Sequence, residues 1–215
     1  MFLSKCKTTK LKQSNSQTGF TIVELMIATT VFAVLLLIAS AAIVTIGRQF
    51  YKGIITARTH SVAVNISEEM SRGIQYSASP PRIIINGNIH AYCIADKEYV
   101  FEKGVVQDGS DPVFVRRDGC EPSWGGGPSA VDDNPSNFSE TELLGDNMRL
   151  AELTLDDINT QSTYSLFVKV VYAPSDNDNE LLNDPTGPNA RCKSGIAGSQ
   201  FCASSELSVT VHKRL

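Results

Sequence analysis

The chain has 215 residues, of which 42% are hydrophobic and 20% are charged, a balance that fits one globular domain together with a separate hydrophobic element. Its formal net charge is −4, and the body that follows the basic first nineteen residues is more acidic, at −8. An acidic body argues against nucleic-acid binding through bulk electrostatics.

The N-terminus is a basic leader, residues 1–19, with four lysines and no acidic residue. An almost continuously apolar segment follows, Phe20–Ile46. At a rise of about 1.5 Å per residue, a helix of this length would cross a hydrocarbon core of about 30 Å. The leader lysines, set against Arg48, Lys52 and Arg58 beyond the segment, favour a cytoplasmic N-terminus by the positive-inside rule. We expect a single membrane span over residues 20–46, with everything after it exported.

The helix is predicted to continue past Gly47 as an amphipathic half that lies on the exported domain. Apolar residues recur there at roughly helical spacing among charged ones. These residues are Phe50, Ile54, Ala57, Val62, Ile66, Met70 and Ile74. Pro80 and Pro81 should end the element, because proline lacks a backbone N–H and restricts the residue before it. The sequence thus predicts one helix from Phe20 to about Ser77, with residues 47–80 forming its amphipathic half and a linker.

After Pro81 the apolar pattern alternates, which predicts an extracytoplasmic antiparallel β domain over residues 81–215. A turn at Asn86-Gly87-Asn88 precedes a strand whose one face would carry Ile89, Ala91, Cys93 and Ala95. Stronger alternation marks 166–172 and 207–211, and weaker candidates are 99–101, 113–116 and 148–155. Long polar loops would occupy 118–147 and 174–201.

Of the five cysteines, four lie beyond the apolar segment: Cys93, Cys120, Cys192 and Cys202. An even number in an exported domain suggests disulfides formed in an oxidising compartment. Four cysteines allow three pairings, and we favour Cys93–Cys120 with Cys192–Cys202, because each closes a loop within one part of the domain. Reduced, buried cysteines are the alternative, since cysteine also packs as a small hydrophobic residue.

The most informative stretch is Gly19-Phe20-Thr21-Ile22-Val23-Glu24-Leu25-Met26, where a glycine ends the basic leader and a lone carboxylate lies in an apolar helix. This stretch resembles the class III signal sequence of type IV pilins and type II secretion pseudopilins. The resemblance implies that prepilin peptidase removes the leader by cutting between Gly19 and Phe20, and that the new N-terminal Phe20 is methylated. The motif covers roughly Lys5 to Ile46, and the rest of the chain agrees with the family in architecture.

Glu24 is the expected assembly residue. A carboxylate costs about 2.5–3.5 kcal/mol at the bilayer centre on insertion scales, and less near the edge, so it usually has a partner. Cleavage would create one, because the new amine of Phe20 lies one helical turn away and could also meet Glu24 of an adjacent subunit. The alternative is a glutamate tolerated at the interface, where a helix N-terminus favours negative charge.

Two other classes of protein compete with this interpretation. An ordinary signal peptide could be cut near Ala39-Ser40-Ala41, but the apolar run is longer than the roughly 7–15 residues of such a segment and contains Glu24. A membrane-anchored enzyme would need a catalytic constellation. His60, His90 and His212 lack a paired nucleophile or ligand cluster in the sequence, so we expect no enzymatic activity.

One acidic stretch suggests a metal. Asp176, Asp178 and Glu180 alternate with asparagines, which crowds oxygen ligands of the kind that Ca²⁺ prefers. The stretch also resembles calcium-binding loops of some pseudopilins. An acidic solvated loop explains the same residues, and the EF-hand spacing is absent. Calcium is the one cofactor that the sequence suggests.

Together these features predict an α+β, pilin-like fold, in which the long N-terminal helix packs through its amphipathic half on an antiparallel sheet. The expected function is a structural subunit of a type IV pilus or related filament, favoured as a minor pilin because the domain and its loops are large. The alternatives are a minor pseudopilin of a type II secretion system and a signal-anchored or secreted binding domain. The partners implied are other pilin subunits, prepilin peptidase, the inner-membrane assembly platform and the membrane. The chain would cross the membrane once before assembly and join an extracellular or periplasmic filament after it.

Overall fold

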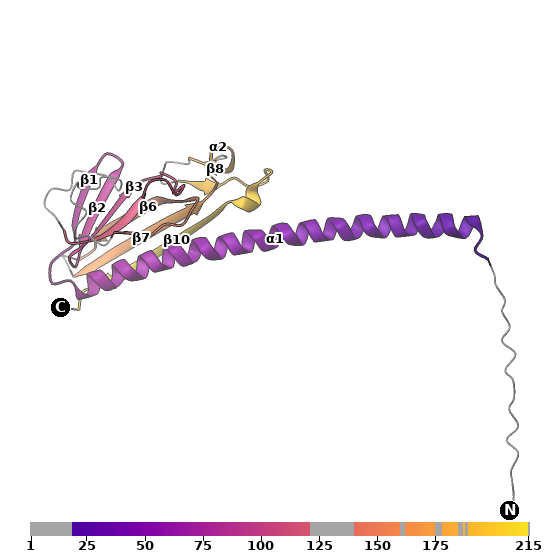
Figure 1. Ribbon diagram of the computed structural model, residues 1–215. Coiled ribbons are helices and arrows are strands. Elements are labelled where there is room, and N and C mark those ends of the chain that lie inside the picture. Colours follow the sequence, from indigo (N-terminus) through magenta and orange to yellow (C-terminus); the bar gives the residue numbers. More distant parts are fainter. Residues whose placement is uncertain are drawn as a thin grey trace, which may run out of the picture. The chain divides into compact units, whose positions relative to one another are not determined.

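One long helix organises the protein. The structure, a computed structural model, describes residues 19–120, 140–159, 162–174, 178–184, 187 and 189–214. Helix α1 (Ile22–Tyr76) has 55 residues and confirms the predicted helix, with ends close to those expected. The chain divides into two compact units that meet between Thr45 and Ile46, so each is described by itself. Figure 1 shows the strands of the second unit gathered beside the C-terminal part of α1.

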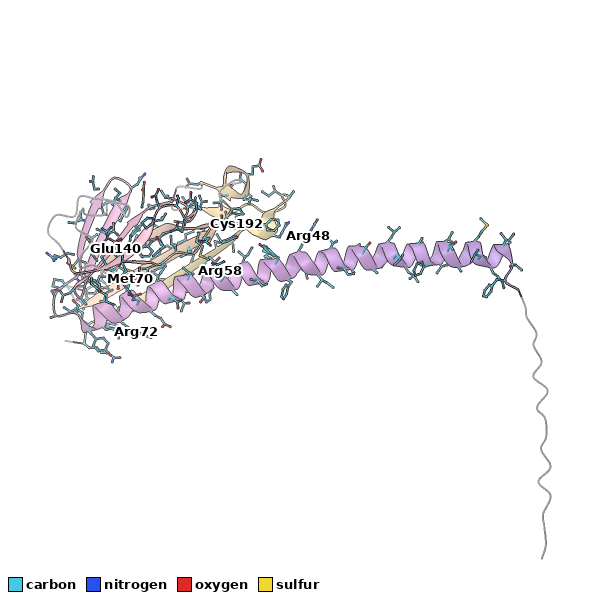
Figure 2. The ribbon with its side chains drawn as sticks, in the orientation of Figure 1. Arg48, Arg58, Met70, Arg72, Glu140 and Cys192 are labelled. Carbon is cyan, nitrogen blue, oxygen red and sulfur yellow. A yellow bond between two sulfur atoms is a disulfide. The ribbon has the colours of Figure 1, made fainter. Side chains whose placement is uncertain are left out.

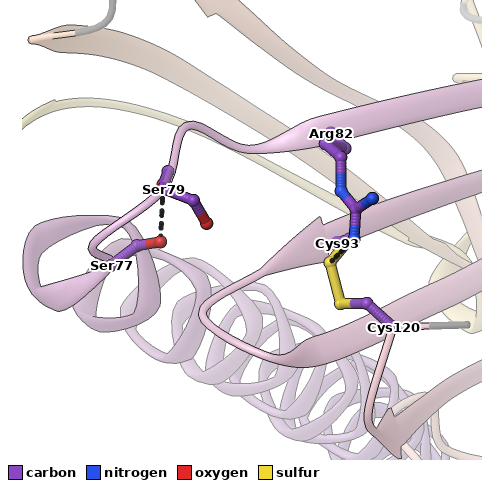
Figure 3. The surroundings of a disulfide bond; sticks show 5 residues. All are labelled: Ser77, Ser79, Arg82, Cys93 and Cys120. Carbon is purple, nitrogen blue, oxygen red and sulfur yellow. Dashed lines mark hydrogen bonds between the residues drawn. A yellow bond between two sulfur atoms is a disulfide. The ribbon is translucent and has the colours of Figure 1, made fainter.

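The C-terminal end of α1 is set by the residues that follow it. Pro80 and Pro81 stand after the helix, as the sequence predicts. Ser77 is buried, and its hydroxyl donates a hydrogen bond of 2.6 Å to the carbonyl of Ser79, which the close-up in Figure 3 shows. The chain then turns directly into the first strand.

The larger of the sheets is antiparallel, with its strands in chain order. Its members are β1 (Arg82–Asn86), β2 (Ile89–Ile94), β3 (Lys97–Glu102), β4 (Phe114–Asp118) and β5 (Thr141–Glu142). Asn86 pairs with Ile89, so Gly87 and Asn88 form the turn that the sequence predicts, and Gly87 has a φ of 61°. Ile94 pairs with Lys97, which leaves Ala95 and Asp96 as the next turn.

The second sheet contains the two strands with the strongest alternation. It is antiparallel in the order β10 (Ala203–His212), β7 (Thr163–Tyr172) and β6 (Met148–Asp157). Val168 pairs with Leu207 across the β7–β10 ladder. The strands expected at 166–172, 207–211 and 148–155 are therefore confirmed. The sequence led us to expect one sheet, and the structure divides the strands between two principal ones.

Short elements occupy the described parts of the polar segment after β7, where the sequence predicts a loop. It holds α2 (Asp178–Leu181), β8 (Leu182–Asn183), β9 (Arg191–Cys192) and the 3₁₀ helix η2 (Ser199–Phe201). A small second core forms here, in which Leu181, Leu182 and Cys202 pack against Val171 of β7. Short elements of this kind carry too few residues to show a period in the sequence.

The main core lies between α1 and the two sheets. Ile66, Met70 and Ile74 of α1 are buried in it, as their spacing predicts. The earlier part of the predicted apolar stripe is wrong, because Ile54 is 50% exposed whereas Ile55 is buried. Thr59 also lies on the buried face, and its hydroxyl has a partner because it donates to the carbonyl of Ile55 at 2.9 Å.

The face of β2 that packs on the core also differs from the prediction. Tyr92 and Ile94 point into the main core, whereas Ala91 and Cys93 lie on the opposite side of the strand and are buried too. Ala95 was expected on the strand face, but it lies in the turn with a φ of 50°. Both sides of β2 are covered, so alternation along the strand could not identify the core side.

Two disulfides join the four cysteines of the second unit. Cys93 on β2 is bonded to Cys120, and Cys192 on β9 is bonded to Cys202. This is the pairing that loop closure favours. In Figure 3 the guanidinium of Arg82 approaches the first bridge, with a hydrogen bond of 3.7 Å to Sγ of Cys93.

The core position of Met70 gives a prediction about stability. Met70 is fully buried in the main core, so Met70→Ala should lower the free energy of unfolding by about 2–5 kcal/mol through lost contacts and a cavity. Chemical denaturation of the full chain in detergent, followed by near-ultraviolet circular dichroism, measures the loss. Ser61→Ala, on the exposed side of α1, is the matched control and should stay within about 0.5 kcal/mol of wild type. Equal stability of the two variants would contradict the packing described here.

Candidate processing and assembly site

The bond between Gly19 and Phe20 lies just before the first turn of α1. Gly19 is exposed, and a Cβ added to it would meet nothing within 4 Å. The side chain of Phe20 is 86% exposed. Packing among the described residues therefore does not require glycine at this position, and nothing in that part of the chain shields the bond from an enzyme.

Glu24 and Thr21 cap the N-terminus of α1 reciprocally. The backbone N–H and the hydroxyl of Thr21 donate to Oε2 of Glu24 at 3.0 and 2.9 Å. In return, the backbone N–H of Glu24 donates to Oγ1 of Thr21 at 3.3 Å. This is a capping box, a Ser or Thr followed three residues later by Glu or Gln. The Thr-x-x-Glu pattern of Thr21 and Glu24 is the sequence signal that predicts this capping box.

The structure gives the Glu24 carboxylate a partner, Thr21, that differs from the predicted amine of Phe20. In the uncleaved chain the nitrogen of Phe20 belongs to a peptide bond and carries no charge. The carboxylate instead bonds to Thr21 at the helix N-terminus, where a negative charge is favoured by the helix dipole. Pairing between Glu24 and the amine released by cleavage stays a prediction.

The remaining polar side chains of the apolar segment bond to their own helix. The hydroxyls of Thr29, Thr30 and Ser40 donate to the carbonyls three residues earlier, at 2.8 to 3.0 Å. Thr45 donates to the carbonyl of Ala41 at 2.9 Å. With the capping box, every polar side chain between residues 20 and 46 has a partner within the chain, which is what a hydrocarbon environment demands.

The apolar side chains of the same segment are uncovered. Phe32, Leu37 and Ile43 are 63%, 70% and 70% exposed. Within the described residues, α1 is the one helix long and apolar enough to cross a membrane, and none of its most apolar window is buried in the protein. By its length and composition, this surface is suited to a membrane or to contact with other apolar helices.

A charged cluster that the sequence did not reveal joins α1 to the larger sheet. Glu69 of α1 accepts a hydrogen bond of 2.8 Å from Arg116 of β4 and lies 3.7 Å from Nζ of Lys97 on β3. The hydroxyl of Tyr99 donates to Glu69 at 3.3 Å. Burial and the negative charge of Glu69 raise the pKa of Tyr99, so its phenol stays protonated. The cluster positions the helix on the sheet, and pairs from such distant parts of the sequence have no local signal.

The remaining predicted site residues are only partly described. Asp176 lies outside the described residues, as does the side chain of Asp178, while Glu180 is exposed on α2. Among the residues that the structure describes, no group of three or more His, Cys, Asp or Glu could hold a metal ion. Calcium binding therefore stays a prediction.

The three histidines lie on separate elements. His60 of α1 is 3.1 Å from the hydroxyl of Ser205, and His212 of β10 is 3.0 Å from that of Thr163. His90 of β2 stacks on Phe101, and burial lowers its pKa. Each of the three histidines therefore has a different neighbour, and none of these contacts joins two histidines.

Comparison with known proteins assigns the N-terminal region. A family model described as a prokaryotic N-terminal methylation motif matches residues 14–40. The match takes in the Gly19–Phe20 bond, the capping box and most of the apolar segment. Comparison with curated proteins and with solved structures gave no match.

The capping box predicts how the helix start responds to mutation. Thr21→Val keeps the side-chain shape but removes the hydroxyl that bonds to both the carboxylate and the N–H of Glu24. Loss of a cap costs about 0.5–2 kcal/mol, so amide exchange at Glu24 in detergent micelles should accelerate by about twofold to thirtyfold. Thr29→Val, which removes a hydroxyl inside the same segment, is the control and should leave the exchange of Glu24 unchanged. Identical exchange in the two variants would rule out the cap.

Proposed function

The chain carries the N-terminal methylation motif that marks type IV pilins and pseudopilins, and from this premise we propose that it is a minor pilin of a type IV pilus or related filament. The motif implies processing by prepilin peptidase and assembly with other pilins. The observation that supports the proposal most is the combination of three features along residues 19–46. They are an unshielded glycine–phenylalanine bond, a capped helix start and an uncovered apolar helix.

The apolar part of α1 suits a protein that leaves a bilayer for a filament. Its polar side chains are satisfied within the helix, so neither environment needs to supply hydrogen bonds to them. Lipid tails are about as apolar as leucine, so exchanging lipid for neighbouring helices does not oppose the hydrophobic effect. Shape complementarity and specific polar contacts then decide whether a subunit docks, and Glu24 is the carboxylate that this segment offers.

Cleavage changes what Glu24 can bind. The new amine of Phe20 would lie within one turn of the carboxylate, which the capping box already holds at the helix end. In a bundle of low dielectric, a buried carboxylate needs a nearby cation together with hydrogen bonds. We propose that Glu24 meets an amine of Phe20 from its own or an incoming subunit, which would set the axial register of docking.

The size of the domain favours a minor pilin. The domain adds a disulfide-bonded segment, with its own small core, to the helix and the two sheets.

We propose a structural role without catalysis, because the described histidines lie apart on three elements. Since pseudopilins share the motif, a minor pseudopilin of a type II secretion system is the second candidate.

The first test is the mature N-terminus. We predict cleavage between Gly19 and Phe20, because this bond is exposed and follows the basic leader. Mass spectrometry of protein isolated from its native membrane should find a chain that begins at methylated Phe20. A chain beginning at Ala42 would instead indicate ordinary secretion, and one that retains Met1 would indicate a simple anchor.

The second test separates insertion from assembly. Glu24→Ala should insert normally, because it makes the span more apolar, yet enter filaments poorly, because the docking carboxylate is gone. Glu24→Gln keeps the shape and can still accept hydrogen bonds, so a similar defect in it would show that charge matters. The measurement is the ratio of each variant in sheared filaments to that in membranes, in cells without the native copy. Wild-type ratios for both variants, with normal cleavage, would remove Glu24 from the mechanism.

A further inference from the structure

A cation stands against one sulfur of the first disulfide. The guanidinium of Arg82, on β1, donates a hydrogen bond of 3.7 Å to Sγ of Cys93, on β2 (Figure 3). The two residues lie directly opposite each other in the antiparallel pairing of these strands, so their side chains share one side of the sheet. A neighbouring arginine stabilises the thiolate form of a cysteine. Arg82 therefore prepares Cys93 to carry a negative charge when the bridge opens.

A row of charged side chains continues from Cys93 across the sheet. Glu98 of β3 pairs with Cys93, and Arg117 of β4 pairs with Glu98 in the next ladder. Glu98 is buried, so its carboxylate needs a cation nearby, and Arg117 follows it in the row. Arg117 in turn bonds to Glu140 at 2.7 Å. The row alternates in sign, and the Cys93 sulfur accepts its hydrogen bond from Arg82, at the cationic end.

The two sulfurs of this bridge also differ in access. Cys93 is 7% exposed, whereas Cys120 is half-buried. Exchange requires an external thiolate to reach one sulfur, and it is faster when the other sulfur leaves as a stabilised thiolate. Access favours attack on Cys120, and Arg82 favours departure of Cys93. Both properties therefore point to the same direction of exchange.

The second disulfide offers a poorer leaving group. Cys202 is 2% exposed and packs in the small second core with Leu181 and Val171. Attack on Cys192, the less buried partner, would expel a thiolate into this apolar core, where a charge is disfavoured. Figure 2 shows Cys192 in another part of the domain from Glu140, which ends the charged row beside the first bridge. We therefore expect the second bridge to resist exchange.

Other contacts hold the strands around the first disulfide. The ladder between β3 and β4, in which Val100 pairs with Val115, keeps β4 in the sheet. After β4, the backbone N–H of Gly119 donates to the carbonyl of Asp96 at 2.7 Å. This bond ties the chain next to Cys120 to the turn between β2 and β3. Opening the bridge would thus leave the strands in place, so exchange does not require unfolding.

We propose that the Cys93–Cys120 disulfide is a thiol–disulfide exchange site for an external dithiol. One thiolate of the dithiol attacks Sγ of Cys120, the S–S bond breaks, and Cys93 leaves as a thiolate beside Arg82. The second thiolate of the reagent then attacks the mixed disulfide and releases Cys120. The reagent is oxidised to a disulfide, and its two electrons and two protons reduce the bridge to two thiols. This inference does not depend on the proposed filament role.

Glutathione tests the direction of exchange. The full chain with Cys6→Ser, folded in detergent micelles, is exposed briefly to reduced glutathione and quenched with iodoacetamide. Peptide mass spectrometry then locates the two labels. We expect glutathione on Cys120 and the alkyl group on Cys93. The opposite placement, or an equal mixture of the two products, would overturn the proposed direction.

Dithiothreitol tests which bridge exchanges. In the same protein the first bridge should open at least about tenfold faster than Cys192–Cys202, because its leaving thiolate is stabilised and its attacked sulfur is accessible. Timed alkylation and peptide mapping give both rates. Equal rates, or a first bridge that opens only after denaturant is added, would overturn the exchange site.

Variants of Arg82 test its part in the exchange. Arg82→Gln should slow opening of the first bridge by about threefold to tenfold, because the leaving thiolate loses its cation. Arg82→Lys keeps the charge and should restore most of the rate, which a purely structural role would not predict. Arg72→Gln, which removes an exposed arginine of α1, is the matched control and should leave the rate unchanged. Equal rates in Arg82→Gln and Arg72→Gln would overturn the role assigned to Arg82.

Discussion

The rest of the structure depends on one constraint, the uncovered apolar surface of the first part of α1. Burying a side chain such as leucine or phenylalanine is worth about 1.5–3 kcal/mol relative to leaving it exposed, and here a whole helical segment lacks cover among the described residues. The side-chain hydroxyls of this segment and the Glu24 carboxylate form hydrogen bonds within the helix. These groups therefore do not depend on water for a hydrogen-bond partner. A membrane before assembly and like segments after it satisfy the same need.

In the second unit, by contrast, α1 is covered on one side, because both sheets pack against its C-terminal part. Ala63, Ser67 and Met70 are buried on one side of α1, and Ala63 and Met70 belong to the main core that the two sheets share with the helix. Around this contact, the ion pair between Glu69 and Arg116 fixes the helix to the larger sheet. The disulfide at Cys202 then braces the loop that reaches back to Tyr51.

Period and motif made much of this architecture predictable. A helix that is apolar along its first half and ends before two prolines has a strong signal, and so do β7 and β10, which place alternate residues in or against the main core. Prediction failed where the deciding contacts are distant in sequence. Ile54 and Ile55 are equally apolar, so only the position of the sheets shows which is buried.

The same limit applies to the sheets and to the site. The division into two sheets depends on which strands pair with each other. The alternation of apolar residues within a strand carries no information about its partners. The short elements after β7 pack through Leu181 and Cys202, which no period marks. At the site, the spacing of Thr21 and Glu24 marks a capping box in the sequence. The same carboxylate also lies one turn from Phe20, so the sequence offers it two partners, and the structure shows the bond to Thr21.

We propose that the apolar segment carries the processed chain from the membrane into the filament. Immunodetection of the native protein in sheared filaments, membranes and medium, from cells with and without prepilin peptidase, tests this proposal. We expect the chain in filaments when the peptidase is active, and in membranes alone when the peptidase is absent. Finding the chain free in the medium, or in the membrane fraction alone whether or not the peptidase is present, would contradict it.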